Sequence, residues 1–333
     1  MTLLFWVSFL VLIAILLALD LGLFRKGDDS ISTREALIRT SIWVSLALCF
    51  NVFVYFAYER HWLGMGLGNG AAIGGAQAAL EFFTGYLVEE SLSLDNIFVI
   101  ALIFTYFRIP PKYQHRVLFW GIIGAVLMRG VLIVLGSALV ARFTWLTYIF
   151  GGVLILTAVK MLIERHDNLE PEKDPLVKLV RRLFPIAEEL HGNRFFIRVN
   201  GVRTATPLFL VLVLVESTDL LFAFDSIPAV FAVTKEPFLI FTSNIFAILG
   251  LRSLYFALAG LMTKFRYLKM SLVYLLAYIG VKMIVVHHYP IPTGVSLAVI
   301  IGILSVGVLA SWVGNRRDTA RLESPLQTDE EMQ

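Results

Sequence analysis

Residues 88–99 read VEESLSLDNIFV, an apolar stretch that contains six polar or acidic side chains within eight positions. The six are Glu89, Glu90, Ser91, Ser93, Asp95 and Asn96. Ionisable groups inside an apolar helix cost about 2.5–3.5 kcal/mol each on membrane-insertion scales, so they normally pair with one another or face a wet cavity. The stretch therefore indicates a polar site that is buried within a membrane helix.

The composition of the whole chain agrees with a membrane location. Hydrophobic residues make up 58% of the 333 residues and charged residues only 16%, which lies outside the range of soluble globular proteins. A membrane helix needs roughly 20 mostly apolar residues. Segments of that length cover 2–24, 36–58, 79–106, 117–140, 144–163, 207–233, 238–262, 268–287 and 292–313. The sequence therefore predicts an all-α polytopic membrane protein with about nine transmembrane helices.

The basic residues predict how these helices are oriented, because loops rich in Lys and Arg stay on the cytoplasmic side. The predicted loops on one side of the membrane hold 21 of the 28 basic residues. The loops on the opposite side hold only Arg60, Arg142 and Lys235. We therefore expect the N-terminus outside and the C-terminus in the cytoplasm. The net charge of +3 is then a signal of topology and does not imply nucleic-acid binding. The single cysteine, Cys49, excludes a disulfide framework within one chain.

Two blocks of three predicted helices share one series of short motifs, which indicates an internal repeat. The first block reads LVEES, GAVLMRG and LTAVKMLI, and the second reads LVEST, AILGLRS and YIGVKMIV. Each block presents Glu, Arg and Lys in that order, as Glu90, Arg129 and Lys160 and then as Glu216, Arg252 and Lys282. Because three spans are an odd number, the second block must cross the membrane upside down relative to the first. Inverted three-plus-three repeats of this kind are typical of secondary transporters.

The repeat divides the chain into six predicted segments. In order, they are two N-terminal membrane helices (1–74), the first repeat (75–163), a cytoplasmic insert (164–205), the second repeat (206–288), a C-terminal membrane helix (289–315) and a polar tail (316–333). Within the insert, 175–184 has the apolar and basic spacing of a short helix on an anionic membrane surface. Asn200 and Gly201 predict a β-hairpin. The tail is polar enough that we expect disorder.

The acidic residues of the two repeats form a predicted cation site. Carboxylate, amide and hydroxyl oxygens without Cys or His favour a hard cation such as Mg²⁺, Ca²⁺ or Mn²⁺. Glu216 and Asp219 share a helix face, and Pro228 is predicted to kink or unwind the same helix near Asp225. The predicted metal ligands are Glu90, Asp95, Asn96, Glu216, Asp219 and Asp225.

Four basic residues inside predicted helices need a partner or a wet surface. All four are candidates for compensating the charge of the acidic site. Arg129 and Arg252 are interpreted first as residues that hold helices together. Lys160 and Lys282 lie nearer the helix ends, where snorkelling toward the membrane interface is an equal alternative.

Four other polar residues carry weaker predictions. Glu89 is either an entrance group or one half of an interhelical salt bridge. Asp20, near the inner end of the first helix, is either a gate residue or an interfacial charge. Asn51 and Asn244 are predicted to form hydrogen bonds between helices.

Four motifs together resemble the TerC family of integral membrane proteins, and in particular its Alx-like branch. They are ESLSLDN (90–96), VESTDLLFAFDSIPA (215–229), SNIFAILGLRSLYF (243–256) and GVKM (280–283), and the resemblance covers about residues 5–315. The resemblance implies a protein of the bacterial inner membrane that handles divalent metals, chiefly by exporting manganese, with links to tellurium resistance and alkaline response. It places the family's acidic membrane residues on the six predicted ligands. Glu89 departs from the Glu-Lys or Glu-Ser pair that is common at this motif.

Residues and resemblance together predict a transporter that exports divalent cations, chiefly Mn²⁺, by alternating access, with protons as the candidate coupling ion. Mn²⁺ is expected as the transported substrate, and no organic cofactor is expected. The expected partners are this cation and the lipid bilayer, while the oligomeric state stays open. One alternative is a non-transporting scaffold or sensor in a metal or tellurite stress-response complex. A membrane enzyme is disfavoured because no HExxH motif, serine elbow, nucleotide loop or redox cysteine pair occurs.

Overall fold

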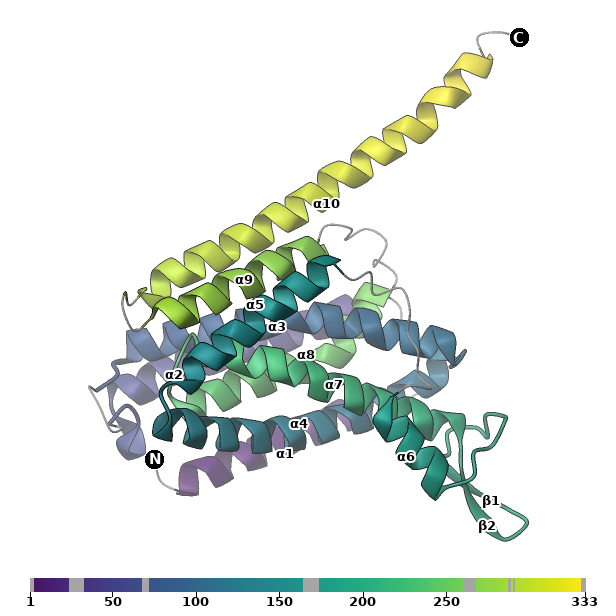
Figure 1. Cartoon of the computed structure of the whole chain (residues 1–333), viewed down its shortest axis with the longest axis horizontal. Coiled ribbons are helices and arrows are strands. Elements are labelled where there is room, and N and C mark those ends of the chain that lie inside the picture. Colours follow the sequence, from purple (N-terminus) through teal and green to yellow (C-terminus); the bar gives the residue numbers. More distant parts are fainter. Residues whose placement is uncertain are drawn as a thin grey trace.

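The structure is a computed structural model that describes residues 3–23, 33–67, 72–163, 174–259, 268–286, 289 and 291–330. The chain is mostly helical, as predicted for an all-α polytopic membrane protein (Figure 1). Its elements in order are α1 (Leu3–Leu23), α2 (Thr33–Glu59), η1 (Trp62–Gly64), α3 (Gly75–Tyr106), α4 (Pro111–Arg142), α5 (Leu146–Ile163), α6 (Pro175–Leu183), β1 (Phe196–Val199), β2 (Val202–Ala205), α7 (Pro207–Phe231), α8 (Pro237–Ala259), α9 (Leu268–Val285) and α10 (Thr293–Glu330).

Within the described ranges, six helices are long and apolar enough to cross a membrane, namely α2, α4, α5, α7, α8 and α10. Two shorter apolar stretches, Trp6–Leu19 and Met270–Val285, lie within α1 and α9. Helix α3 is 32 residues long and contains four acidic residues along its length. Nine spans therefore stay a prediction, while a bundle with several membrane helices is established.

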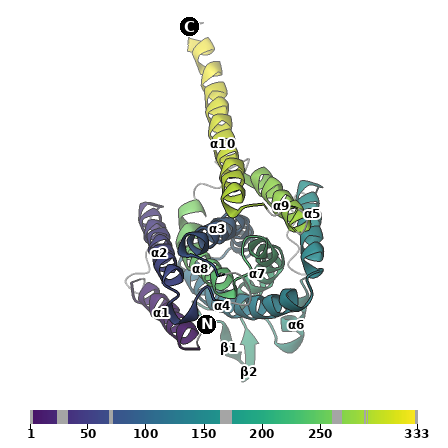
Figure 2. The ribbon, with the colours of Figure 1, turned by 90° about the vertical axis from the view of Figure 1, so that its left-hand side faces the viewer.

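The centre of the bundle is built by α3, α4, α7 and α8, which pack against one another (Figure 2). Helix α8 is enclosed by its neighbours, since 94% of its apolar window is buried inside the molecule. Helix α2 packs on α3 and α8 at one flank, and α5 packs on α9 at the other. Helix α10 contacts α9 and α3 and then extends away from the bundle (Figure 1).

The side chains are distributed as expected for a bundle surrounded by lipid. Large apolar side chains such as Val52 and Leu156 are exposed on the outer helices, whereas charged side chains such as Glu89 and Arg129 are buried at the centre. Lipid tails can cover the first kind of surface without cost, while a charge inside the membrane must face protein partners or water. The interior is consequently the place to look for a polar site.

Helices α5 and α9 approach each other closely where two glycines meet. A Cβ atom on Gly151 would lie 2.8 Å from the carbonyl oxygen of Gly280, and a Cβ atom on Gly280 would lie 2.8 Å from that of Gly151. Small residues at a crossing let two helix backbones approach in a membrane, where packing and not the hydrophobic effect drives association. This contact joins a helix of the first predicted repeat to a helix of the second.

The segment between the predicted repeats contains a helix and a hairpin, as the sequence predicts. Helix α6 begins after Asp174, whose carboxylate caps its first turn, and it buries Val177 and Val180 against the bundle. The antiparallel strands β1 and β2 join at Asn200 and Gly201, which have φ angles of 51° and 81°. Positive φ at both positions is what a two-residue hairpin turn requires. Helix α6 packs against α7, a contact that the sequence did not predict. The predicted contact of its basic residues with the membrane surface stays a prediction.

Two expectations about local structure are wrong. Helix α10 continues to Glu330, so the segment from Arg316 is helical and the expectation of disorder is wrong. Helix α7 is continuous through Asp225, so unwinding there is wrong, whereas a kink stays a prediction. Pro228 lies only three residues before the end of α7 at Phe231, where few hydrogen bonds of the helix follow it.

Candidate functional site

Arg129 is the centre of a buried ion-pair network. It projects from α4 with only 1% of its side chain exposed, and it forms salt bridges with Glu89 of α3 and Asp219 of α7. Its Nη2 atom lies 2.8 Å from Oδ1 of Asp219, and its Nε atom lies 3.2 Å from Oδ2. These two parallel bonds are the fork geometry in which guanidinium and carboxylate match best. Arg129 therefore links the two predicted repeats.

Neutral side chains of α7 and α8 complete this network. Asn244 donates a hydrogen bond from Nδ2 to Oε2 of Glu89 at 2.9 Å, and its Oδ1 accepts one from Nη1 of Arg129 at 3.1 Å. The same Nη1 donates to the hydroxyl of Ser226 at 3.3 Å. All of these side chains are largely buried. The network thus fixes α3, α4, α7 and α8 at one level of the bundle.

The charges of this network do not cancel. One guanidinium faces two carboxylates, Glu89 and Asp219, so the group carries a net negative charge when both acids are ionised. An unpaired charge in a low-dielectric interior is costly, and a second cation would remove this cost. The salt bridges of Arg129 can therefore stabilise the network without a ligand, while its net negative charge still attracts a cation.

Glu90 and Glu216, which the repeat pattern pairs with each other, share an unusual feature. Each has a buried carboxylate oxygen, Oε2, that meets no hydrogen-bond partner in the described part of the chain. The carboxylate of Glu216 lies directly against the backbone of α4 at Gly124, where an added Cβ atom would collide with it. Buried oxygens without protein partners are uncommon in folded proteins, and such an oxygen can take a water, an ion or a proton as its partner.

The remaining predicted ligands lie in separate surroundings. Asp225 accepts a hydrogen bond from the hydroxyl of Thr157 on α5 at 2.8 Å, and Lys160 lies within its electrostatic range. Asp95 is half-buried on α3. Asn96 is buried, and its Oδ1 has no hydrogen-bond partner within the ranges that the structure covers.

The six predicted ligands do not form one coordination shell in this conformation. Among the described residues, no group of three or more His, Cys, Asp or Glu side chains is placed to hold a metal ion. Arg129 engages Asp219, and Thr157 engages Asp225, so these carboxylates face protein donors. The assignment of the six residues as metal ligands stays a prediction. Asp20 lies in α1, but its side chain falls outside the described residues.

The other basic and polar candidates divide clearly by burial. Arg252 and Lys282 are buried, whereas Lys160 is exposed. Snorkelling is therefore wrong for Lys282, which packs in the interior with 4% of its surface exposed. Glu89 is part of an interhelical salt bridge, and Asn244 makes the interhelical bonds predicted for it. The side-chain oxygen of Asn51 meets no partner within the described ranges.

Sequence reasoning missed Ser226 and, more importantly, Glu81. Glu81 is a buried carboxylate two helical turns before Glu89 on α3. Its presence near the start of an apolar segment, which was predicted to begin at residue 79, is the signal that could have identified it. Only the structure shows that this carboxylate is covered by other helices and not by lipid headgroups.

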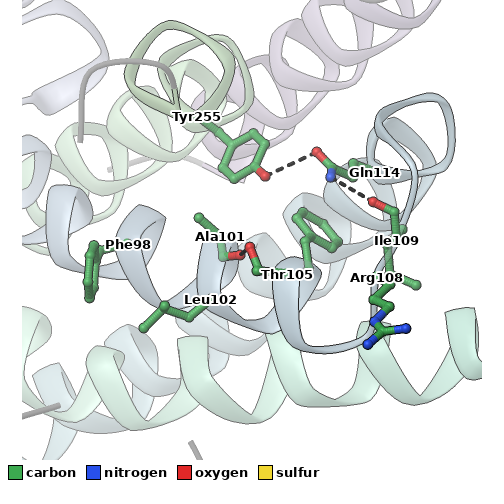
Figure 3. Close-up of a pocket in the computed structure, with 9 residues that line it drawn as sticks. Phe98, Ala101, Leu102, Thr105, Arg108, Ile109, Gln114 and Tyr255 are labelled. Carbon is green, nitrogen blue, oxygen red and sulfur yellow. Dashed lines mark hydrogen bonds between the residues drawn. The ribbon is translucent and has the colours of Figure 1, made fainter. Parts of the chain in front are cut away.

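A cavity of about 450 Å³ opens beside the C-terminal part of α3, between α4 and α8 (Figure 3). Its wall is both polar and apolar, and includes Phe98, Thr105 and Arg108. Tyr255 donates a hydrogen bond to Oε1 of Gln114 at 3.0 Å, and Gln114 donates to the carbonyl oxygen of Ile109 at 2.9 Å. The cavity begins one turn after Asp95, and so approaches the polar segment of α3.

Helices that bury ion pairs and unpartnered carboxylates inside an apolar exterior define an integral membrane protein with a polar interior. Comparison with known proteins gives its family. The model of the family described as "Integral membrane protein TerC family" matches residues 74–319, and the chain belongs to this family. The resemblance inferred from the sequence motifs is thereby confirmed.

Curated relatives extend over almost the whole chain. "Uncharacterized membrane protein STKORF319" of Myxococcus xanthus is 46% identical over 311 residues, which are 93% of this chain and 92% of the relative. "Putative membrane-bound redox modulator Alx" of Photorhabdus laumondii is 45% identical over 318 residues, covering 95% and 97%. The protein of the same name from Escherichia coli (strain K12) is 44% identical over 320 residues, covering 96% and 97%. No solved structure matches the chain.

Proposed function

We propose that this chain is a secondary transporter that exports divalent metal cations, chiefly Mn²⁺, from the bacterial cytoplasm across the inner membrane. The observation that carries this proposal is the network of Glu89, Arg129 and Asp219, in which one buried guanidinium pairs with two carboxylates from different repeats. Its ligands are oxygen atoms, which suit Mn²⁺, Ca²⁺ and Mg²⁺ better than softer metals. In the proposed orientation the N-terminus lies outside and the C-terminus lies in the cytoplasm.

Helix packing supports the proposed inverted repeat. Helix α3 packs against α8, and α4 packs against α7. Exchange of the first repeat (α3, α4, α5) with the second (α7, α8, α9) converts one of these pairs into the other. The same exchange converts the pair of α5 and α9 into itself, and these two helices are also in close contact. A pseudo-two-fold axis of this kind places a substrate site where the repeats meet.

In the proposed mechanism, Arg129 acts as a tethered cation that holds the site in its metal-free form. A divalent cation that enters from the cytoplasm competes with the guanidinium for Asp219 and Glu89. Glu90 and Glu216 supply further oxygens, since each has a carboxylate oxygen without a protein partner among the described residues. When the ion leaves on the outer side, Arg129 pairs again with both acids. The buried acids thus always face a compensating charge, as a low-dielectric site requires.

Protons are the proposed counter-ions. A carboxylate oxygen that is buried without a donor, as in Glu90 and Glu216, must be neutralised when the metal leaves. A proton is the smallest ion that can do so without an additional partner. The cavity beside α3 supports a path from the predicted cytoplasmic side, because it lies one helical turn beyond Asp95.

The alternative function is a non-transporting scaffold or sensor in a metal or tellurite stress-response complex. The name of the Alx relatives, which describes a redox modulator, favours a regulatory role for those proteins. This chain has one cysteine, Cys49, which lies exposed on α2. Any thiol-disulfide chemistry would therefore need a thiol from a second molecule.

Mn²⁺ flux into sealed vesicles that contain the purified protein separates these functions. Asp95→Asn and Asp219→Asn are expected to abolish flux, whereas Glu188→Gln, which changes an exposed acid of the insert, is the matched control and should leave it intact. Undiminished flux in both Asp variants would remove the site assignment. An absence of flux in the unmodified protein, together with co-purifying partners, would favour the scaffold.

A further inference from the structure

A second buried acidic cluster lies at the end of the bundle where α2 ends and α3 begins. Its centre is Glu81, with 6% of its surface exposed. Gln77 donates a hydrogen bond to Oε1 of Glu81 at 2.8 Å, and the hydroxyl of Thr234 donates to Oε2 at 2.6 Å. Thr234 belongs to the connection between α7 and α8, and its oxygen also accepts from the backbone N–H of Glu236 at 3.1 Å. The cluster therefore joins both predicted repeats.

Tyr58 gives this cluster a feature that protein contacts do not explain. The residue is fully buried on α2, with 0% exposure, and its hydroxyl meets no hydrogen-bond partner among the described residues. Glu81 and Glu236 both lie within electrostatic range of this hydroxyl. A buried hydroxyl normally has a partner because its desolvation is costly. An orphan oxygen within electrostatic range of two carboxylates indicates a ligand that the oxygen can bind.

The donor atoms around Glu81 identify the class of this ligand. Lys282 of α9 is buried and lies within electrostatic range of Glu81, while Glu236 is half-buried at the edge of the cluster. Glu81 and Glu236 thus supply two carboxylates to the cluster. The available ligand atoms are carboxylate, hydroxyl and phenol oxygens, with no sulfur or imidazole among the residues named. This donor set suits a divalent hard cation.

The cluster is separate from the network around Arg129. Glu81 precedes Glu89 by eight residues on α3, which places it about 12 Å farther along the helix axis. Among the described residues, the two groups share no hydrogen-bonding side chain. Arg129 forms salt bridges with its acids, and Lys282 lies within electrostatic range of Glu81, so each group has a buried base near a buried acid.

We propose that Glu81, Tyr58 and Thr234, with Glu236 at the rim, form a second divalent-cation site at the end of the bundle predicted to face outward. This inference rests on the proposed function, in which an ion crosses from the central network toward that end. Lys282 compensates Glu81 when the site is empty. The ion occupies the space next to the Tyr58 hydroxyl before it is released.

Tyr58→Phe separates a ligand role from a structural one. Because the hydroxyl makes no hydrogen bond with a described residue, its removal should not destabilise the metal-free protein. A ligand role instead requires weaker metal binding, by about fivefold or more for the loss of one ligand oxygen. Tyr55→Phe is the matched control, since Tyr55 lies three residues earlier on α2 and is exposed. Thermal unfolding in a chelator checks the first expectation.

Electron paramagnetic resonance counts bound Mn²⁺ on the purified full-length protein, because the signal of the free ion falls on binding. Glu81→Gln is expected to bind one Mn²⁺ ion fewer per chain than the unmodified protein, and Tyr58→Phe to bind that ion more weakly. Glu216→Gln, which alters the central site, should keep the ion that depends on Glu81. Tyr55→Phe should bind as the unmodified protein does.

The outcomes show separately whether the second site or the proposed transport function fails. If Glu81→Gln and Tyr58→Phe bind Mn²⁺ like the unmodified protein while Glu216→Gln loses an ion, the second site alone is overturned. If vesicles show no Mn²⁺ flux but Glu81→Gln still loses a bound ion, the site stands and the transport proposal fails. If the unmodified protein binds no Mn²⁺, both are overturned.

Discussion

Arg129 on α4 holds Asp219 on α7 through two parallel N–H···O bonds of 2.8 and 3.2 Å, and the same guanidinium reaches Glu89 on α3. This relationship joins helices from both predicted repeats at a buried level of the bundle. A residue so placed can serve stability, the compensation of charge, or both. A substitution of Arg129 must therefore be compared with further variants that separate the loss of stability from the loss of charge compensation.

Arg129→Met is expected to destabilise the protein by about 3–5 kcal/mol, because it leaves two buried carboxylates without their cation. Thermal unfolding in detergent measures this loss. The triple variant Arg129→Met, Glu89→Gln, Asp219→Asn removes the charges together and should recover most of the stability, while Mn²⁺ flux stays absent. A triple variant as unstable as the single one would contradict the charge explanation.

Gly124→Ala tests the contact between α4 and the carboxylate of Glu216. The added Cβ atom would collide with this carboxylate, so we expect a stability cost of about 1–3 kcal/mol from overpacking and a reduced Mn²⁺ flux. Gly152→Ala on α5 is the matched control, because a Cβ atom there meets nothing within 4 Å. Its expected effect is neutral or slightly stabilising. Equal flux in both variants would show that the position of the Glu216 carboxylate is unimportant.

Local patterns allowed much of the fold to be predicted from the sequence. The hairpin at Asn200 and Gly201 follows from residues that tolerate positive φ, and α6 follows from the spacing of its apolar and basic residues. Both depend on nearest neighbours in the chain. Helix bounds were predicted less well, as the continuation of α10 to Glu330 shows.

The partners of the buried charges could not be predicted in the same way. Glu89 and Glu90 are adjacent, and they project about 100° apart on a helix. Which of them meets Arg129 depends on how α3 and α4 are rotated, and this is fixed by tertiary packing. The burial of Lys282 has the same cause, since snorkelling and pairing are equally compatible with its place in the sequence.

Asp174 links the insert to the membrane bundle next to Glu216. Its Oδ1 accepts from the backbone N–H groups of Leu176 and Val177, while Oδ2 accepts from the hydroxyl of Ser217 at 2.7 Å. Asp174→Ala should cost about 1 kcal/mol through loss of the helix cap, and it should increase proteolysis of the insert. Ser217→Ala keeps the cap and removes only the link to α7, so it is the matched comparison. If limited proteolysis cuts Ser217→Ala as fast as Asp174→Ala, the link to α7 holds the insert and the cap does not.

The stability of the protein is expected to depend on pH through Glu236, which lies in the connection before α8. Burial is the largest influence on its carboxyl and raises the pKa above the ordinary value of 4.5. A raised pKa means that the folded state holds the proton more tightly, so Glu236 contributes stability at low pH that is lost as the pH rises through the raised value. In metal-free protein, Glu236→Gln should therefore increase the unfolding temperature at pH 8, and the difference should disappear as the pH falls toward 4.5. Unfolding scans across this range in a chelator check it, with Glu188→Gln as an exposed control that should show no such trend. A difference that grows on acidification would show that the carboxylate of Glu236 is stabilised and not strained by its surroundings.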